Sequence, residues 1–208
     1  MLCLLGLIDG LTATGVVLGG FIFGIFLIHQ SKKREAHLMV QMALVIIFAG
    51  LLYLGVFLDF LWVLSTGSNL SEPHGIVAQL SYIWFPPVVI CAAAVGLELE
   101  YPEHKWKVIA IYLVGTALFY VHIFLDPIDR SFYLGTYAPE GEGLIDYNIR
   151  ADSLAGIYLV LMLIPVILGL FWGALKFGKE TSGALRKQFL LLGIGVACFG
   201  IFGLLEGF

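Results

Sequence analysis

The chain has 208 residues, of which 60% are hydrophobic and only 12% are charged, and its formal net charge is −4. Soluble domains carry about 25% charged residues, so a chain this apolar needs the bilayer as part of its solvent. This composition excludes an ordinary soluble enzyme. The sequence also has no basic tract with interleaved aromatic residues, which argues against nucleic acid as a partner.

Six apolar runs are long enough to form helices that cross a hydrocarbon core, which takes about 20 residues. Each run is continuously apolar rather than alternating, so we expect helices and not barrel strands. The predicted fold class is therefore all-α, with residues 1–208 forming one polytopic transmembrane helical bundle. The expected spans are Leu11–Ile28, Leu38–Leu64, Ile76–Leu97, Val108–Leu125, Leu154–Leu175 and Gln188–Leu205.

The positive charges indicate a direction for this bundle. Nine of the eleven Lys and Arg residues fall in the gaps after the first, third and fifth runs. The positive-inside bias predicts that these basic loops are cytoplasmic, with both termini outside a multi-pass protein of the cell membrane. The nine residues are Lys32, Lys33, Arg34, Lys105, Lys107, Lys176, Lys179, Arg186 and Lys187.

The gap between the fourth and fifth runs, residues 126–153, is long, acidic and rich in Gly, Pro and Tyr. Loops of this length are usually functional or disordered. Four aromatic residues argue against complete disorder, so we expect a re-entrant segment or a cap that lies on the outer surface. These residues are Phe132, Tyr133, Tyr137 and Tyr147.

The first run contains two GxxxG pairs, Gly15 with Gly19 and Gly20 with Gly24. Small residues four positions apart allow two helices to approach closely in lipid. These pairs predict packing within the bundle or, as an alternative, a homodimer through the first span.

Prolines interrupt two of the expected spans, at Pro86 and Pro87 in the third and at Pro165 in the fifth. Proline has no amide proton, so a carbonyl one turn earlier loses its partner and the helix tends to kink. A serine, a water molecule or a neighbouring helix must then bind the freed carbonyl. Each kink is either a structural bend or a hinge.

Ionisable side chains within spans are costly and therefore point to function. Asp59 and His122 lie toward the outer side, where Tyr82, Tyr120 and Glu206 could join them in an outward-facing polar pocket for a ligand. The alternative is that each group meets only interfacial water and headgroups, which is the stronger expectation for Asp9, Asp126 and Glu206. No histidine or cysteine spacing predicts a metal or haem site, and no lysine lies within a span, so we expect no cofactor.

Three segments resemble the amino-terminal seven-helix sensor region of certain prokaryotic histidine kinases. They are YIWFPPVVICAAAVGLELE in the third run, LFYVHIFLD at the end of the fourth, and RKQFLLLGIG from Arg186 at the start of the sixth. The resemblance implies a membrane sensor that passes a signal to a cytoplasmic partner. The chain as printed has six runs rather than seven, and it carries no kinase.

Three functions remain open on the sequence. The first is a sensor-like or receptor-like module that binds a small molecule or lipid from outside. The second is a small transporter or its substrate-binding membrane subunit, for which Pro86–Pro87 is the best candidate for a broken helix. The third is an accessory subunit of a larger membrane complex. A membrane enzyme is not expected, because no catalytic motif is present.

Overall fold

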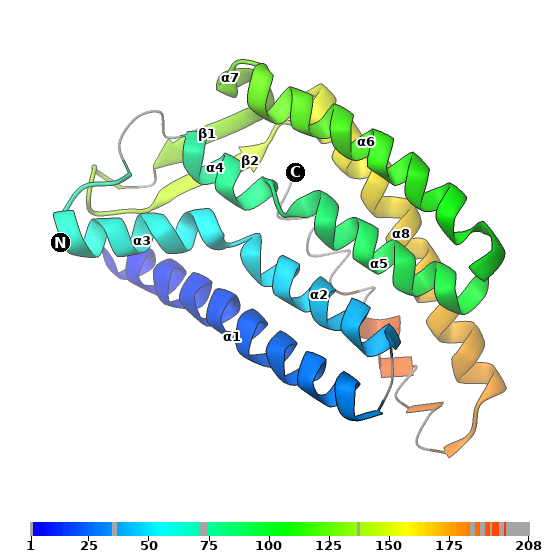
Figure 1. Ribbon diagram of the computed structural model, residues 1–208. Coiled ribbons are helices and arrows are strands. Elements are labelled where there is room, and N and C mark those ends of the chain that lie inside the picture. The colour runs from blue at the N-terminus through cyan, green and yellow to red at the C-terminus, as the bar shows by residue number, and fades with distance from the viewer. Residues whose placement is uncertain are drawn as a thin grey trace.

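The computed structural model describes residues 2–34, 37–70, 75–136, 138–183, 186–187, 190–191, 193–195 and 198. Helices dominate the described chain, and one small hairpin of strands completes it (Figure 1). The elements are α1 (Leu4–Arg34), α2 (His37–Leu51), α3 (Leu54–Thr66), α4 (Gly75–Tyr82), α5 (Phe85–Glu100), the 3-10 helix η1 (Pro102–His104), α6 (Lys105–Leu125), α7 (Ile128–Ser131), β1 (Phe132–Thr136), β2 (Ile145–Ile149) and α8 (Leu154–Glu180).

Four helical segments in the described chain are long and apolar enough to cross a membrane, as the sequence predicted. They are Leu4–Lys33, Gly75–Glu98, Pro102–Leu125 and Leu154–Glu180. The pair formed by α2 and α3 also passes this test, and it gives a fifth span if it is counted as one. The sixth expected span, Gln188–Leu205, lies mostly outside the described residues, so the structure does not establish six spans.

The second expected span is not one straight helix. The chain bends by 44° between α2 and α3, and the α-helical ladder stops at Leu52 and Tyr53, whose N–H groups bond three residues back to Ala49 and Gly50. No proline stands at this break. Helix α4 approaches closely just after this break, where a Cβ atom on Gly55 would overlap the carbonyl oxygen of Val77.

The third expected span is interrupted near the predicted prolines. The ladder stops at Ile83 and Trp84, and α5 then begins with Pro86 and Pro87 in its first turn. Proline suits this position because the first N–H groups of a helix have no intrahelical partner. Pro165, by contrast, lies inside α8, which is continuous from Leu154 to Glu180.

The long predicted loop is an ordered hairpin rather than a re-entrant helix. After the short α7, strands β1 and β2 pair antiparallel, with Phe132 opposite Ile149 and Thr136 opposite Ile145. Ser153 then begins α8, because its side-chain oxygen accepts a bond of 3.0 Å from the backbone N–H of Gly156. The sequence predicted a cap, but it did not predict these strands.

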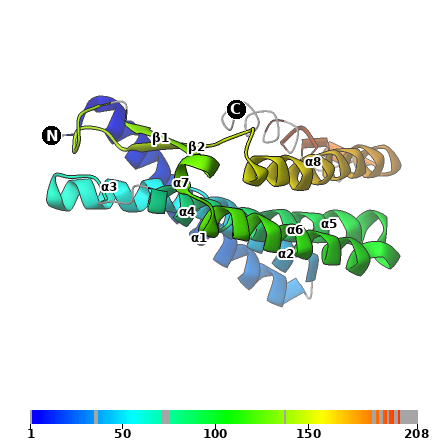
Figure 2. The same ribbon diagram turned by 90° about the horizontal axis from the view of Figure 1, so that it is seen from above.

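The helices form a bundle with two distinct ends. Helix α8 lies along one side of the layer that contains α5 and α6 (Figure 2). The beginning of α1, α7 and the hairpin gather at one end, which we call the hairpin end (Figure 1). The end of α1 and the turns at residues 101–104 and 181–183 gather at the other end. We call it the basic end, because the described lysines of the three basic loops lie there.

Two glycine pairs in α1 have different surroundings. A Cβ on Gly20 would contact Gly50 of α2 at 3.1 Å, and a Cβ on Gly24 would overlap Ile47. Among the described residues, no heavy atom lies within 4 Å of a Cβ built on Gly15 or Gly19. The second GxxxG pair therefore packs α1 against α2, and the first faces outward from the described bundle.

Candidate functional site

Asp59 is the most completely buried charged group that the structure describes, and its carboxylate is fully engaged. It is 0% exposed. Its Oδ1 accepts a hydrogen bond of 2.8 Å from the N–H of Leu70. Its Oδ2 accepts one of 3.0 Å from Asn69 Nδ2 and one of 2.9 Å from the N–H of Ile145. All three donors belong to the chain itself, so both oxygens of this side chain are hydrogen-bonded without a ligand.

Asn69 extends this arrangement to the loop between β1 and β2. It is 3% exposed, its Nδ2 also donates to the carbonyl oxygen of Gly143 at 2.9 Å, and its Oδ1 accepts from the N–H of Gly141 at 2.9 Å. We call Asp59 and Asn69, with the backbone groups they bind, the Asp59 cluster. It joins α3, the turn that follows α3, and the hairpin loop.

Glycine is required where these two turns touch. Gly67 ends α3 with a φ of 75°, and its N–H binds the carbonyl oxygen of Val63. Gly141 has a φ of 76°, and a Cβ there would lie 2.0 Å from the carbonyl oxygen of Gly67. A side chain at Gly141 would therefore separate the hairpin loop from α3.

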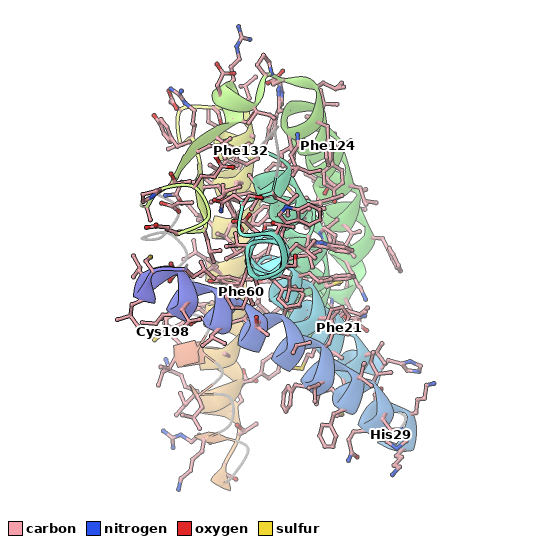
Figure 3. The ribbon with its side chains drawn as sticks, turned by 90° about the vertical axis from the view of Figure 1, so that its left-hand side faces the viewer. Phe21, His29, Phe60, Phe124, Phe132 and Cys198 are labelled. Carbon is pink, nitrogen blue, oxygen red and sulfur yellow. The ribbon has the colours of Figure 1, made fainter. Side chains whose placement is uncertain are left out.

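An apolar contact lies beside the Asp59 cluster. Leu144 of the hairpin loop is 2% exposed and packs with Phe60 and Val63 of α3. A Cβ atom on Gly10 of α1 would overlap the ring of Phe60. Figure 3 labels Phe60 where α3 passes α1. The N–H of Cys3 donates to the carbonyl oxygen of Glu142 at 2.7 Å, so the start of α1 is attached to the same loop.

A second polar group connects the hairpin to both broken spans. The hydroxyl of Tyr147 in β2 lies 2.6 Å from Ser81 Oγ in α4, and it also reaches the carbonyl oxygen of Leu52 at 3.5 Å. Ser81 Oγ accepts a bond of 2.9 Å from the N–H of Gly55, at the start of α3. We call this chain from Tyr147 through Ser81 to Gly55 the hairpin relay. It places one strand residue at the interruptions of two neighbouring spans.

Side chains from neighbouring helices bind the carbonyls that proline frees. In a regular helix the carbonyl oxygen of Ile83 would accept a hydrogen bond from the N–H of residue 87, but Pro87 has no N–H. The hydroxyl of Tyr120 in α6 donates to this oxygen at 2.7 Å instead. In the same way, Gln79 Nε2 donates at 3.0 Å to the carbonyl oxygen of Ile123, whose regular partner would be Pro127.

His122 forms a separate pair at the end of α6. Its Nδ1 lies 2.8 Å from Asp126 Oδ2, and its ring stacks on that of Tyr158 in α8 with centroids 5.9 Å apart. Ser131 Oγ donates to the carbonyl oxygen of His122 at 3.1 Å. The side chain of His122 is 18% exposed and that of Asp126 is 33% exposed, so the pair reaches solvent or headgroups at the hairpin end.

An exposed ion pair closes the hairpin outside the spans. Arg150 donates from Nε and Nη2 to the carboxylate of Asp152 at 3.2 Å, and its guanidinium lies 4.6 Å from the ring centroid of Tyr133. The hydrogen bond with Asp152 raises the pKa of Arg150, and the bond from Arg150 lowers the pKa of Asp152. This pair fixes the chain between β2 and α8.

The structure does not bring the predicted pocket residues together as one site. Asp59 bonds within the Asp59 cluster, His122 pairs with Asp126, and Tyr120 binds a backbone carbonyl. In the described residues, no hydrogen bond or ion pair links Asp59 with His122. The ring of Tyr82 packs against those of Phe132 and Tyr147, with ring centroids 5.4 Å and 5.9 Å apart. Glu206 lies outside the described residues.

The sequence reasoning missed Asn69, Gln79 and Ser81, and it counted Tyr147 only as one of four aromatic residues in the loop. One signal was available, because Pro87 and Pro127 each imply a freed carbonyl that needs a donor. The sequence does not say which donor. In the residues that the structure describes, no group of three or more His, Cys, Asp or Glu side chains could hold a metal ion.

Comparison with protein-family models, with curated proteins and with solved structures finds no match for this chain. The fold and the contacts above are therefore the basis for the function.

Proposed function

We propose that this chain is an integral protein of the cell membrane, with six spans and both termini outside, that works as a sensor-type module. In this proposal the hairpin end faces outward and detects a small molecule or lipid. The basic end faces the cytoplasm and passes the change to a signalling partner. The observation that carries the proposal is the hairpin relay, because it bonds the outer hairpin directly to the interruptions of two spans.

A sensor needs two arrangements of its helices that bind the ligand with different affinity. Interrupted helices are suitable elements, since a change of bend at the break moves the whole segment beyond it. The bend of 44° between α2 and α3 and the interruption between α4 and α5 lie beside each other, joined by the bond from Gly55 to Ser81. A ligand that displaced β2 would pull on both through Tyr147.

The Asp59 cluster has a different part in this proposal. Its carboxylate has three donors already, so it holds the hairpin loop on α3 and does not bind the ligand. The partly exposed pair of His122 and Asp126, beside Tyr158, is the better contact for a polar ligand at this end.

The second candidate is a small transporter, and the neighbouring helix breaks favour it. Transporters bind their substrates near the membrane midplane at discontinuous helices. The depth of the breaks argues for the sensor instead. The 15 residues of α2 rise about 22 Å from the basic end, so the breaks lie in the outer third of a core of about 30 Å.

The test measures whether the hairpin controls the basic end. Cys3, Cys91 and Cys198 are replaced by Ser, and spin labels are attached through Lys107→Cys and Lys179→Cys, two exposed positions at the basic end. Distances between the labels are then measured by pulsed electron resonance in lipid nanodiscs. Tyr147→Phe removes the relay hydroxyl, and we expect it to redistribute the label distances.

Tyr133→Phe is the matched control, because it changes an exposed tyrosine of the same hairpin and should leave the distances unchanged. If Tyr147→Phe also leaves them unchanged in a folded protein, the hairpin does not act on the basic end and the sensor proposal fails. The transporter is the better description if cysteines placed at the two breaks react with water-soluble reagents from each side of the membrane in turn.

A further inference from the structure

One exposed face of α8 changes its chemistry along the helix axis. Toward the hairpin end the face is aliphatic, with Leu161 62% and Leu168 60% exposed. Trp172 follows at 68% exposed, and Lys176 and Lys179, both exposed, come next. At 100° per residue these five positions fall within about 80° of one another, so they form one stripe. The opposite face, with Met162, Val166, Gly173, Ala174 and Gly178, is buried against the bundle.

The length of α8 up to Trp172 matches the hydrocarbon core of a bilayer. From Leu154 to Trp172 the helix rises about 27 Å, which is close to the thickness of the hydrocarbon core. Tryptophan prefers the boundary of that core. Trp106, 75% exposed at the start of α6, lies about 28 Å along the axis from Leu125 and so marks the same boundary from a second helix.

The two lysines lie where lipid phosphates are found. Lys176 and Lys179 are about 6 Å and about 10 Å beyond Trp172 along the axis, which is the depth of the headgroup layer. Neither forms an ion pair within the described chain, although Glu180 is a near neighbour on α8. Lys105 differs, because its ammonium group is 2.6 Å from Glu98 and its side chain is only 11% exposed.

We propose that this stripe of α8 binds an anionic glycerophospholipid of the leaflet at the basic end. The phosphate lies between the ammonium groups of Lys176 and Lys179, the ring of Trp172 lies at the level of the ester groups, and an acyl chain follows Leu168 and Leu161. A lysine beside an anionic membrane surface strengthens association about fivefold, so the pair contributes about 25-fold. This inference requires only that α8 crosses the membrane, and it does not depend on the sensor proposal.

The experiment titrates the delipidated, full-length protein with phosphatidylglycerol or phosphatidylcholine and counts bound lipids by native mass spectrometry. We expect the first phosphatidylglycerol to bind more tightly than phosphatidylcholine. The double variant Lys176→Gln, Lys179→Gln should weaken the binding of phosphatidylglycerol about 25-fold and leave that of phosphatidylcholine unchanged. Both side chains are exposed, so this variant should fold.

Two controls give the result its meaning. Lys105→Gln changes a lysine that Glu98 already neutralises, so it should bind phosphatidylglycerol as the unchanged protein does. Lys32→Gln with Lys33→Gln removes two other exposed charges at the same end and should have a much smaller effect. The proposal is overturned if the α8 variant keeps its affinity or if the Lys32, Lys33 variant loses as much. It is also overturned if inorganic phosphate displaces the lipid at equal concentration, since the face would then bind any anion.

Discussion

The two ends of this bundle use polar residues in opposite ways. At the hairpin end, the side chains of Asp59, Asn69 and Ser81 are at most 3% exposed. Their hydrogen bonds join separate elements of the chain. At the basic end, Lys32, Lys176 and Lys179 are exposed, and Lys105 alone among the described lysines is in an ion pair. Buried polar groups must be satisfied and so determine the structure, whereas exposed cations contribute little to it. The comparison teaches that the first end determines shape and the second is available for contacts.

The largest effect is expected at Asp59. Asp59→Asn places an amide NH₂ group against donors that now bind a carboxylate, so at least one buried donor loses its partner. Leaving a buried donor without its partner costs about 1–3 kcal/mol, and more where the lost partner was charged. Unfolding in mixed detergent micelles, followed by circular dichroism, measures the loss. Asp126→Asn is the control, since that carboxylate is one third exposed and should cost less than about 1 kcal/mol. Equal losses would contradict the special position of Asp59.

The next effect is expected at the contact between α3 and α4. Gly55→Ala puts a methyl group 1.9 Å from the backbone oxygen of Val77, so the two helices must separate at a cost of about 1–3 kcal/mol. Gly19→Ala is the matched change in open space, and it should be neutral or stabilising because alanine favours helix. The same unfolding measurement compares the two. A loss at Gly19 as large as that at Gly55 would mean that a further chain covers α1.

A smaller effect is expected at Tyr120. Tyr120→Phe removes the hydroxyl that binds the carbonyl oxygen of Ile83, leaving an unsatisfied group within the bundle. We expect a loss of about 1–2 kcal/mol in the free energy of unfolding. Tyr101→Phe, at a position 60% exposed, should have no measurable effect. If Tyr120→Phe is equally silent, another group binds this carbonyl.

The smallest effect is expected at the exposed pair of Arg150 and Asp152. The bond from Arg150 lowers the pKa of Asp152 below its ordinary value near 4. The pair therefore stabilises the hairpin above that pH, and its contribution is lost as the pH falls through the lowered pKa of the folded state. Hydrogen exchange of the β2 amides, measured from pH 5 downward, should show this loss, and Asp152→Asn should abolish the pH dependence. A pH dependence that survives in Asp152→Asn would assign it to another carboxylate.

The candidate site was predictable only in part. The depth of Asp59 and its need for partners followed from its position between apolar residues, and the need for a donor followed from Pro87. The partners did not follow, because Asn69, Tyr147 and Tyr120 come from separate elements of the chain. Their hydrogen bonds span 10, 66 and 37 residues to Asp59, Ser81 and Ile83 respectively. Hydropathy patterns carry no information about such pairs.

The sequence by itself determined the apolar helices and the grouping of the lysines, since continuous hydrophobicity and loop charge are local properties that lipid and water sort directly. Only the tertiary structure decided where the helices break. Span two bends without a proline beside the close contact of Gly55 with α4, and the hairpin loop bonds through its backbone N–H groups to Asp59 and Asn69. Those outcomes depend on which surfaces meet, and that is a property of the assembled bundle rather than of any segment.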